Sequence, residues 1–139
     1  MRFVFFILPL FVLSCKSYST KRNTKNFSSG NYEVLKITDS TYSDKKNYII
    51  TIDTDNKRIS GKFDCNTFGA TYTLGEDNFI DFGIVRATKM YCNGNMITER
   101  KFFKVLSNIK YYTFEKDLLM FYSEKKSPEV VKLKKINDE

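Results

Sequence analysis

Short segments of strand-like composition recur along most of this chain of 139 residues, and they narrow the choice of fold. Each segment is rich in β-branched and aromatic residues, and turn-forming residues such as those at 53–56 and 75–78 follow several of them. We expect eight strands, over residues 32–37, 48–52, 58–63, 70–74, 79–84, 110–114, 118–122 and 129–133. Eight short strands at this spacing are typical of an antiparallel barrel or sandwich.

One segment departs from this pattern, because its apolar residues recur with the period of a helix. Between residues 95 and 109, Phe102, Phe103, Leu106 and Ile109 recur at i, i+1, i+4 and i+7. They stand at spacings that place them on one face of a helix. We therefore expect a mainly β (β-rich α+β) protein, with one helix over about 95–109 packed on the sheet.

The composition argues against an enzyme. The chain has no histidine, which excludes a Ser-His or Cys-His nucleophilic pair and a His-ligated catalytic zinc. Two pairs of acids, Asp53 with Asp55 and Glu76 with Asp77, lie in predicted turns, where carboxylates are ordinarily solvated. We expect no catalytic residues, no metal and no cofactor.

The N-terminal residues predict export. Arg2 precedes an apolar run over residues 3–13, and Ser14 and Cys15 follow it. The run is too short for a membrane-spanning helix, which needs about 20 residues, but a basic start, a short apolar run and a small residue are typical of a secretory signal. Residues 12–15 also resemble a bacterial lipobox, which implies that 1–14 are removed and that Cys15 is lipidated. An ordinary cleaved signal and an uncleaved anchor are the alternatives.

Residues 15–31 are predicted to be a lipidated cysteine and a flexible basic tether, ahead of a domain over 32–139. Ser, Thr, Asn and Lys dominate this stretch, which has four cations and no acid. The domain itself has 18 basic and 16 acidic residues, so it lacks the charge of a nucleic-acid-binding domain. A basic tether suits anionic lipid headgroups, and a solvated linker is the equal alternative. We expect no nucleic acid partner and a monomer.

Two cysteines remain once Cys15 carries lipid. Cys65 and Cys92 are an even pair, and an exported chain meets an oxidising compartment. We expect them to form a disulfide. A reactive thiol or a metal site is the alternative, but two sulfurs without histidine make a poor zinc site, and the chain has no Cys-x-x-Cys.

Three blocks of sequence resemble the META/HslJ domain family. Residues 61–72 resemble its Gly-Cys-Asn…Gly…Tyr block, 82–92 its Thr-x-Met-x-Cys block, and 96–106 the helix that follows. Asp64 stands where the family usually has glycine. The resemblance implies a small lipocalin-like β-barrel of about eight strands with one packed helix. Many bacterial members are envelope lipoproteins associated with heat-shock induction and antibiotic tolerance, parasite members are associated with virulence, and no catalytic residues are established.

The positions that match the family motifs are expected to be structural. They are Asn66, Gly69, Tyr72, Thr88, Met90, Glu99, Phe102 and Leu106. Asn66 is expected to satisfy backbone groups in the turn after Cys65, and Met90 to fill the core beside the disulfide.

Glu99 differs from the other motif residues, because it is a charged residue on the apolar stripe with Phe102 and Phe103. A carboxylate there cannot stay buried and charged without partners. The candidate partners are backbone N–H groups of the cysteine loops, Thr88, Arg86 and Lys89. With such partners Glu99 clamps the helix to the loop carrying Cys92; the alternative is a carboxylate that faces an open pocket.

These observations favour a non-catalytic envelope lipoprotein, anchored in a membrane on the periplasmic side, that supports stress tolerance through protein or envelope contacts. The rival function is a small barrel that binds an apolar ligand, since an eight-stranded barrel either fills its interior with side chains or holds one small molecule. The chain has 13 Phe and 9 Tyr, and so many rings in one small domain favour a filled interior.

Overall fold

The computed structural model describes residues 27–38, 40–41, 47–92 and 96–136. All eight expected strands are present, and two strands of two residues, β2 and β7, were not expected from the sequence. The strands are β1 (Gly30–Ile37), β2 (Ser40–Thr41), β3 (Ile49–Asp53), β4 (Arg58–Lys62), β5 (Thr67–Leu74), β6 (Ile80–Phe82), β7 (Arg86–Ala87), β8 (Tyr111–Glu115), β9 (Leu118–Tyr122) and β10 (Val131–Lys135). The helix α1 (Ile97–Leu106) and a short 3-10 turn, η1 (Glu76–Asn78), complete the described elements.

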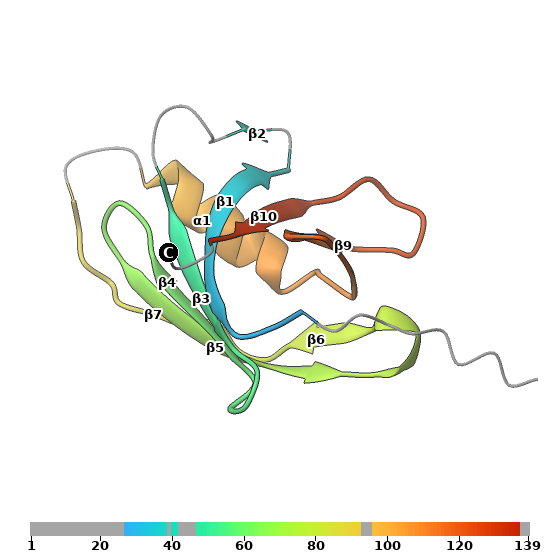
Figure 1. The fold of residues 1–139 in the computed structure, drawn as a ribbon. Helices are drawn as coiled ribbons and strands as arrows, with labels where there is room; N and C mark the ends of the chain where they lie inside the picture. Colours follow the sequence, from blue (N-terminus) through green and yellow to red (C-terminus); the bar gives the residue numbers. More distant parts are fainter. Residues whose placement is uncertain (1–26, 39, 42–46, 93–95, 137–139) are drawn as a thin grey trace, which may run out of the picture.

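The strands form one antiparallel sheet that curls into a nearly closed barrel (Figure 1). Their order is β6-β5-β4-β3-β1-β10-β9-β8, and β7 pairs with β5 beside this path. The two edge strands meet at a β-bridge between Phe79 and Tyr111, next to which the Ile80 N–H donates to the Lys110 carbonyl at 3.0 Å. The side chains of Lys110 and Asp81 pair across the same seam. The expected small lipocalin-like barrel is therefore confirmed.

Side chains fill the interior of the barrel. Alternate residues of each long strand point inward, as Ile50 and Ile52 do on β3 and Phe68 and Tyr72 do on β5. The buried hydrophobic side chains have exposed fractions between 0 and 7%. A cavity wide enough for a ligand would leave accessible surface on the residues around it, so these values describe a packed core.

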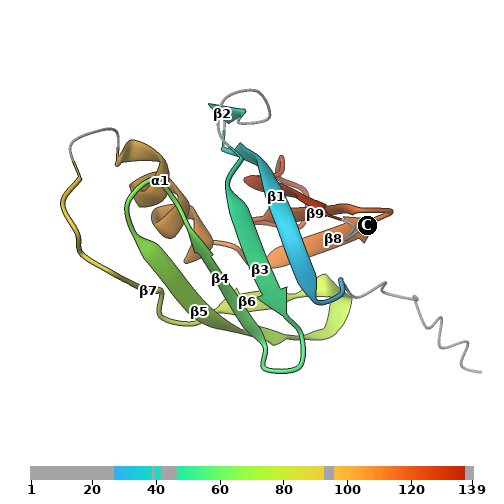
Figure 2. The same ribbon diagram turned by 60° about the vertical axis from the view of Figure 1, so that its left-hand side comes forward.

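Helix α1 covers one end of the barrel (Figure 2). The ring of Phe102 packs against Phe63 and Phe68, with centroid distances of 5.0 and 5.2 Å. The helix is shorter than the expected 95–109: residues 93–95 lie outside the described residues, and α1 ends at Leu106. It stops there because the side chains of Ser107 and Asn108 both donate to the Lys104 carbonyl, at 2.9 and 3.1 Å, and so satisfy a terminal acceptor of the helix.

Phe27 covers the other end of the barrel, so the domain begins earlier than expected. Its ring is 4% exposed and packs against Tyr72 and Tyr112, at 5.6 and 5.1 Å between centroids. The sequence placed Phe27 in the tether and began the domain at residue 32, whereas β1 already starts at Gly30. The polar composition of residues 15–31 gave no sign that Phe27 belongs to the core, because the residues it contacts lie far away in the sequence. The signal, Cys15 and most of the tether fall outside the described residues.

Gly61 permits the close packing of β4 under the helix. A Cβ atom there would lie 2.9 Å from the Ile49 carbonyl oxygen and 2.9 Å from the ring of Phe68. Both neighbours are held in the barrel wall, so only glycine fits. Within the described residues, no helix is long and apolar enough to cross a bilayer.

Candidate functional site

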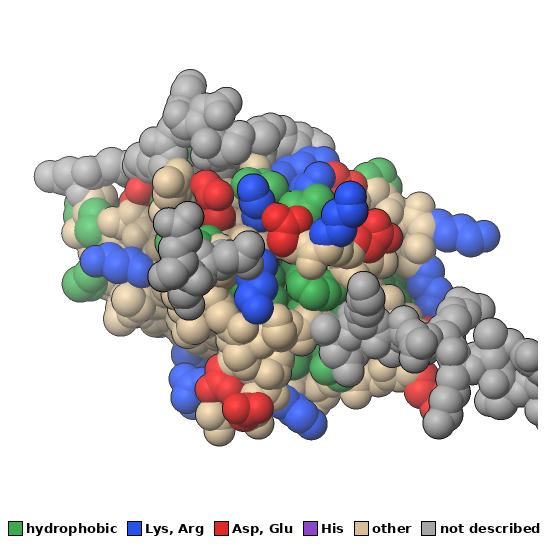
Figure 3. Space-filling view, in the orientation of Figure 1, with side chains coloured by type: hydrophobic (Ala, Val, Ile, Leu, Met, Phe, Trp, Pro, Cys, Tyr) green, Lys and Arg blue, Asp and Glu red, His purple; other side chains and the backbone are tan. Residues whose placement is uncertain are grey.

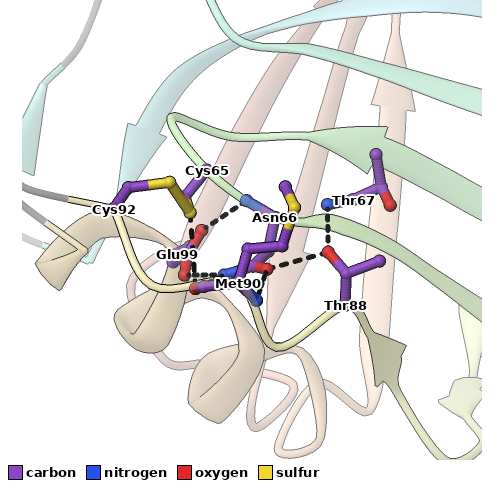
Figure 4. The surroundings of a disulfide bond; sticks show 7 residues. All are labelled: Cys65, Asn66, Thr67, Thr88, Met90, Cys92 and Glu99. Atoms are coloured by element: carbon purple, nitrogen blue, oxygen red, sulfur yellow. Dashed lines mark hydrogen bonds between the residues drawn. A yellow bond between two sulfur atoms is a disulfide. The ribbon is translucent and has the colours of Figure 1, made fainter.

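Three segments that are distant in the sequence meet beside the start of α1. They are the turn after β4, which carries Cys65 and Asn66, the segment after β7 over residues 88–92, and the first turn of the helix (Figure 4). The expected disulfide joins the first two: Cys65 and Cys92 are bonded, with their Cα atoms 5.9 Å apart. This covalent link holds a loop that has little secondary structure of its own.

Glu99 ties the helix to the turn after β4. Its side chain is buried, with 3% exposed. Oε2 accepts a hydrogen bond from the backbone N–H of Asn66 at 3.1 Å, and Oε1 accepts one from Asn66 Nδ2 at 2.7 Å. The expectation of a buried carboxylate held by a backbone N–H of a cysteine loop is confirmed, but both bonds reach the turn that carries Cys65, whereas the expected clamp was to the loop that carries Cys92. Of the other expected partners, Thr88 bonds Asn66 instead, and no ion pair joins Glu99 to Arg86 or Lys89 among the described residues.

The side chain of Asn66 connects Glu99 to the segment after β7. Asn66 Oδ1 accepts hydrogen bonds from the Met90 N–H and from the Thr88 hydroxyl, both at 2.8 Å. Asn66 Nδ2 lies 3.3 Å from the Met90 carbonyl, in addition to its bond to Glu99. Thr88 Oγ1 in turn accepts the Thr67 N–H at 3.2 Å. Asn66 was expected to satisfy its own turn; its side chain instead satisfies backbone of a segment more than twenty residues away.

The expected core position of Met90 is wrong. Its side chain is 55% exposed, and the residue contributes its backbone instead. The Met90 N–H and carbonyl both face Asn66, and the carbonyl oxygen lies 3.4 Å from Cys65 Sγ. Because both backbone groups of Met90 point into the protein, its side chain is directed to solvent.

Of the remaining motif residues, three are in the core. Phe102, Leu106 and Tyr72 have exposed fractions of 1, 0 and 3%. Burial, with a further contribution from the Asp53 carboxylate, raises the pKa of Tyr72 to about 12. Gly69 lies in β5, where a Cβ would meet Arg58 Nη2 at an ordinary 3.6 Å, so steric fit does not explain this glycine.

Asp64, the departure from the family pattern, has a local role. Its Oδ2 accepts a hydrogen bond from the hydroxyl of Tyr48 at 2.9 Å. Positive φ angles among the described non-glycine residues occur at Thr38, Lys57, Asp77, Asn78 and Lys116, so Asp64 adopts an ordinary backbone conformation. An aspartate is therefore accommodated at this position without backbone strain.

A groove of about 450 Å³ opens to solvent above this network. Asn66 and Glu99 lie at its bottom, and Met96, Arg100 and Phe103 are among its sides. The polar atoms at the bottom already bond one another, which suits a structural role better than proton transfer. No group of three or more His, Cys, Asp or Glu residues that could hold a metal occurs in the described part of the chain.

Comparison with known proteins agrees with this architecture. A crystal structure of a DUF4847 family protein from Bacteroides vulgatus ATCC 8482 superposes with a TM-score of 0.57, covering 81% of this chain and 96% of that one. Its sequence identity of 15% makes this a similarity of fold. No curated protein matches the chain. The family model of the META domain matches residues 25–135, and the chain belongs to the META domain family.

Proposed function

We propose that this protein is an exported lipoprotein, anchored by lipid on Cys15, whose META domain supports envelope stress tolerance without catalysing a reaction. In this proposal the domain acts through contacts of its outer surface with proteins or other components of the envelope. The lipobox-like residues 12–15 support the anchor, and a disulfide within the domain suits an oxidising compartment.

The packed interior is the observation that carries the functional part of the proposal. Tyr32, Ile50, Leu119 and Leu133 come from four different strands, and all four side chains are 0% exposed. A lipocalin-like barrel that binds an apolar molecule needs an empty interior of several hundred cubic ångströms. A core filled by aromatic and branched side chains therefore favours surface contacts over an enclosed ligand.

The anchor is tested by labelling with palmitate in the native host. We expect label in the wild-type protein and in Ser14→Ala, which keeps a small residue before the cysteine. Cys15→Ser should carry no label and should move from the membrane fraction to the soluble fraction. Membrane fractionation that stays unchanged without label would refute the lipoprotein.

The role in stress tolerance is tested by complementing a deletion strain under heat and antibiotic stress. We expect the wild-type gene to restore survival and Cys15→Ser to fail at equal protein level. Full rescue by Cys15→Ser would show that membrane attachment is irrelevant. Binding of one apolar dye molecule per protein, inside the barrel, would instead favour the ligand-binding barrel.

A further inference from the structure

The most exposed large hydrophobic side chains of the described residues are concentrated in one segment. Ile84, Met90, Tyr91 and Ile97 are 82, 55, 86 and 68% exposed, whereas the other exposed large hydrophobic side chains reach only 36 to 38%. Single exposed apolar residues are common on protein surfaces, but a cluster of large ones usually marks an interaction site.

The same segment carries exposed charge of one sign. Arg86, Lys89 and Arg100 are exposed, and no side-chain hydrogen bond or ion pair engages them in the described part of the protein. Between Asp81 and Glu115 the sequence has one acid, Glu99, and its carboxylate is buried against Asn66. We call the surface formed by Ile84, Arg86, Lys89, Met90, Tyr91, Ile97 and Arg100 the basic–apolar face.

The basic–apolar face lies along one outer edge of the molecule. In Figures 1 and 2 the segment that leads from β7 toward α1 runs outside the barrel wall. In Figure 3 hydrophobic and basic side chains lie side by side at the left-hand edge, where that segment runs. Asp64 is an exposed acid beside Cys65, which is bonded to Cys92, and the hydroxyl of Tyr48 donates to its carboxylate.

The disulfide and the Asn66 network hold this face in place. Cys92 is bonded to Cys65, and both backbone groups of Met90 are fixed by Asn66. Met90 and Tyr91 are thus presented on a backbone that is already ordered. A partner that buries them loses little conformational entropy at this segment.

We propose that the basic–apolar face docks on an anionic lipid surface. Cations next to tyrosine and aliphatic side chains match such a surface: the charges meet anionic headgroups, and the apolar side chains enter the boundary between headgroups and acyl chains. The inference takes its setting from the envelope location proposed above, but it does not require lipid on Cys15.

The test uses residues 26–139, which contain all the described elements and the core but lack the signal and the four tether cations. The chain has no tryptophan, so Tyr91→Trp places a single reporter in the face. We expect a blue shift of its fluorescence with phosphatidylcholine vesicles containing phosphatidylglycerol, no shift with pure phosphatidylcholine, and reversal by high salt. Ile136→Trp, outside the face, should show no shift with either vesicle.

Charge reversal supplies the matched comparison. In the Tyr91→Trp background, Lys89→Glu with Arg100→Glu should weaken vesicle binding more than about tenfold, since each cation near an anionic surface is worth about fivefold. Lys126→Glu with Lys134→Glu makes the same change in net charge on exposed residues outside the face and should weaken binding far less. Thermal unfolding of each variant confirms that it is folded.

Two results would overturn the inference: equal fluorescence with both vesicle compositions, or equal weakening by the two charge-reversed pairs. A face that serves a protein partner instead would give the first of these. Palmitate label on Cys15 together with no vesicle binding would refute the docking face and leave the lipoprotein intact. Vesicle binding by a protein that takes up no palmitate label would support the docking face and refute the lipoprotein.

Discussion

Replacing Glu99 tests whether its carboxylate holds α1 to the turn after β4. Glu99→Ala leaves the buried N–H of Asn66 without its acceptor and Asn66 Nδ2 with only the longer contact to Met90. An unsatisfied buried donor costs about 1–3 kcal/mol, so we expect the free energy of unfolding to fall by about 2–4 kcal/mol. Glu99→Gln keeps the volume and one acceptor oxygen, but its amide N–H₂ faces one of the two donors. Removing a buried charge offsets part of that loss, and we expect about 1–2 kcal/mol.

The measurement is urea unfolding of the oxidised protein, with the midpoint and the slope both fitted. Glu115→Ala, an exposed glutamate on β8, is the control and should stay within about 0.5 kcal/mol of wild type. Asn66→Ala combined with Glu99→Ala should cost clearly less than the sum of the two single changes, because both remove the hydrogen bond between Asn66 Nδ2 and Glu99 Oε1. A Glu99→Ala protein as stable as the control would refute the clamp, as would strict additivity in the double variant.

Three further predictions concern other parts of the domain. Replacing Cys65 and Cys92 together by serine should lower the free energy of unfolding by about 3–4 kcal/mol, the chain-entropy value for a loop of this length, measured in urea. Phe27→Ala should lower the free energy of unfolding by about 3 kcal/mol, because a buried ring that packs on two tyrosines is lost from the end of the barrel opposite α1. The folded state raises the pKa of Tyr72 to about 12 from 10.0, so it holds the phenol proton more tightly than the unfolded chain. That contribution to stability is complete below about pH 10 and is lost as the pH rises toward 12, which tyrosinate absorbance and circular dichroism will follow together.

Each of these has its own control. Reduced wild type should match the double serine variant, and two free thiols in the exported protein would contradict the disulfide. Phe103→Ala, at a partly buried ring on α1, should cost less than Phe27→Ala; the reverse order would contradict a core role for residue 27. Tyr72→Phe should remove part of the alkaline loss of stability, whereas Tyr91→Phe, at an exposed tyrosine, should leave the pH profile unchanged.

Local patterns in the sequence were sufficient for predicting the strands and the buried face of the helix. Alternation in segments such as 48–52 marks one buried face, and the spacing of Phe102 and Leu106 marks the face of α1 that meets the barrel. The burial of Glu99 followed from the same periodicity, because a carboxylate on an apolar stripe must enter the protein with it. These features depend on residues a few positions apart, and secondary structure repeats on that scale.

Tertiary structure alone decided the features that join distant residues. Phe27 reads as part of a polar tether until the rings of Tyr72 and Tyr112 cover it, and the barrel closes through a bridge between Phe79 and Tyr111. Methionine is a residue type that often fills a core. The side chain of Met90 nevertheless points to solvent, because both of its backbone groups bond to the side chain of Asn66. A hydrogen bond between a side chain and a backbone more than twenty residues away leaves no periodic trace in the sequence. Only the folded chain brings those groups together and sets which way each side chain faces.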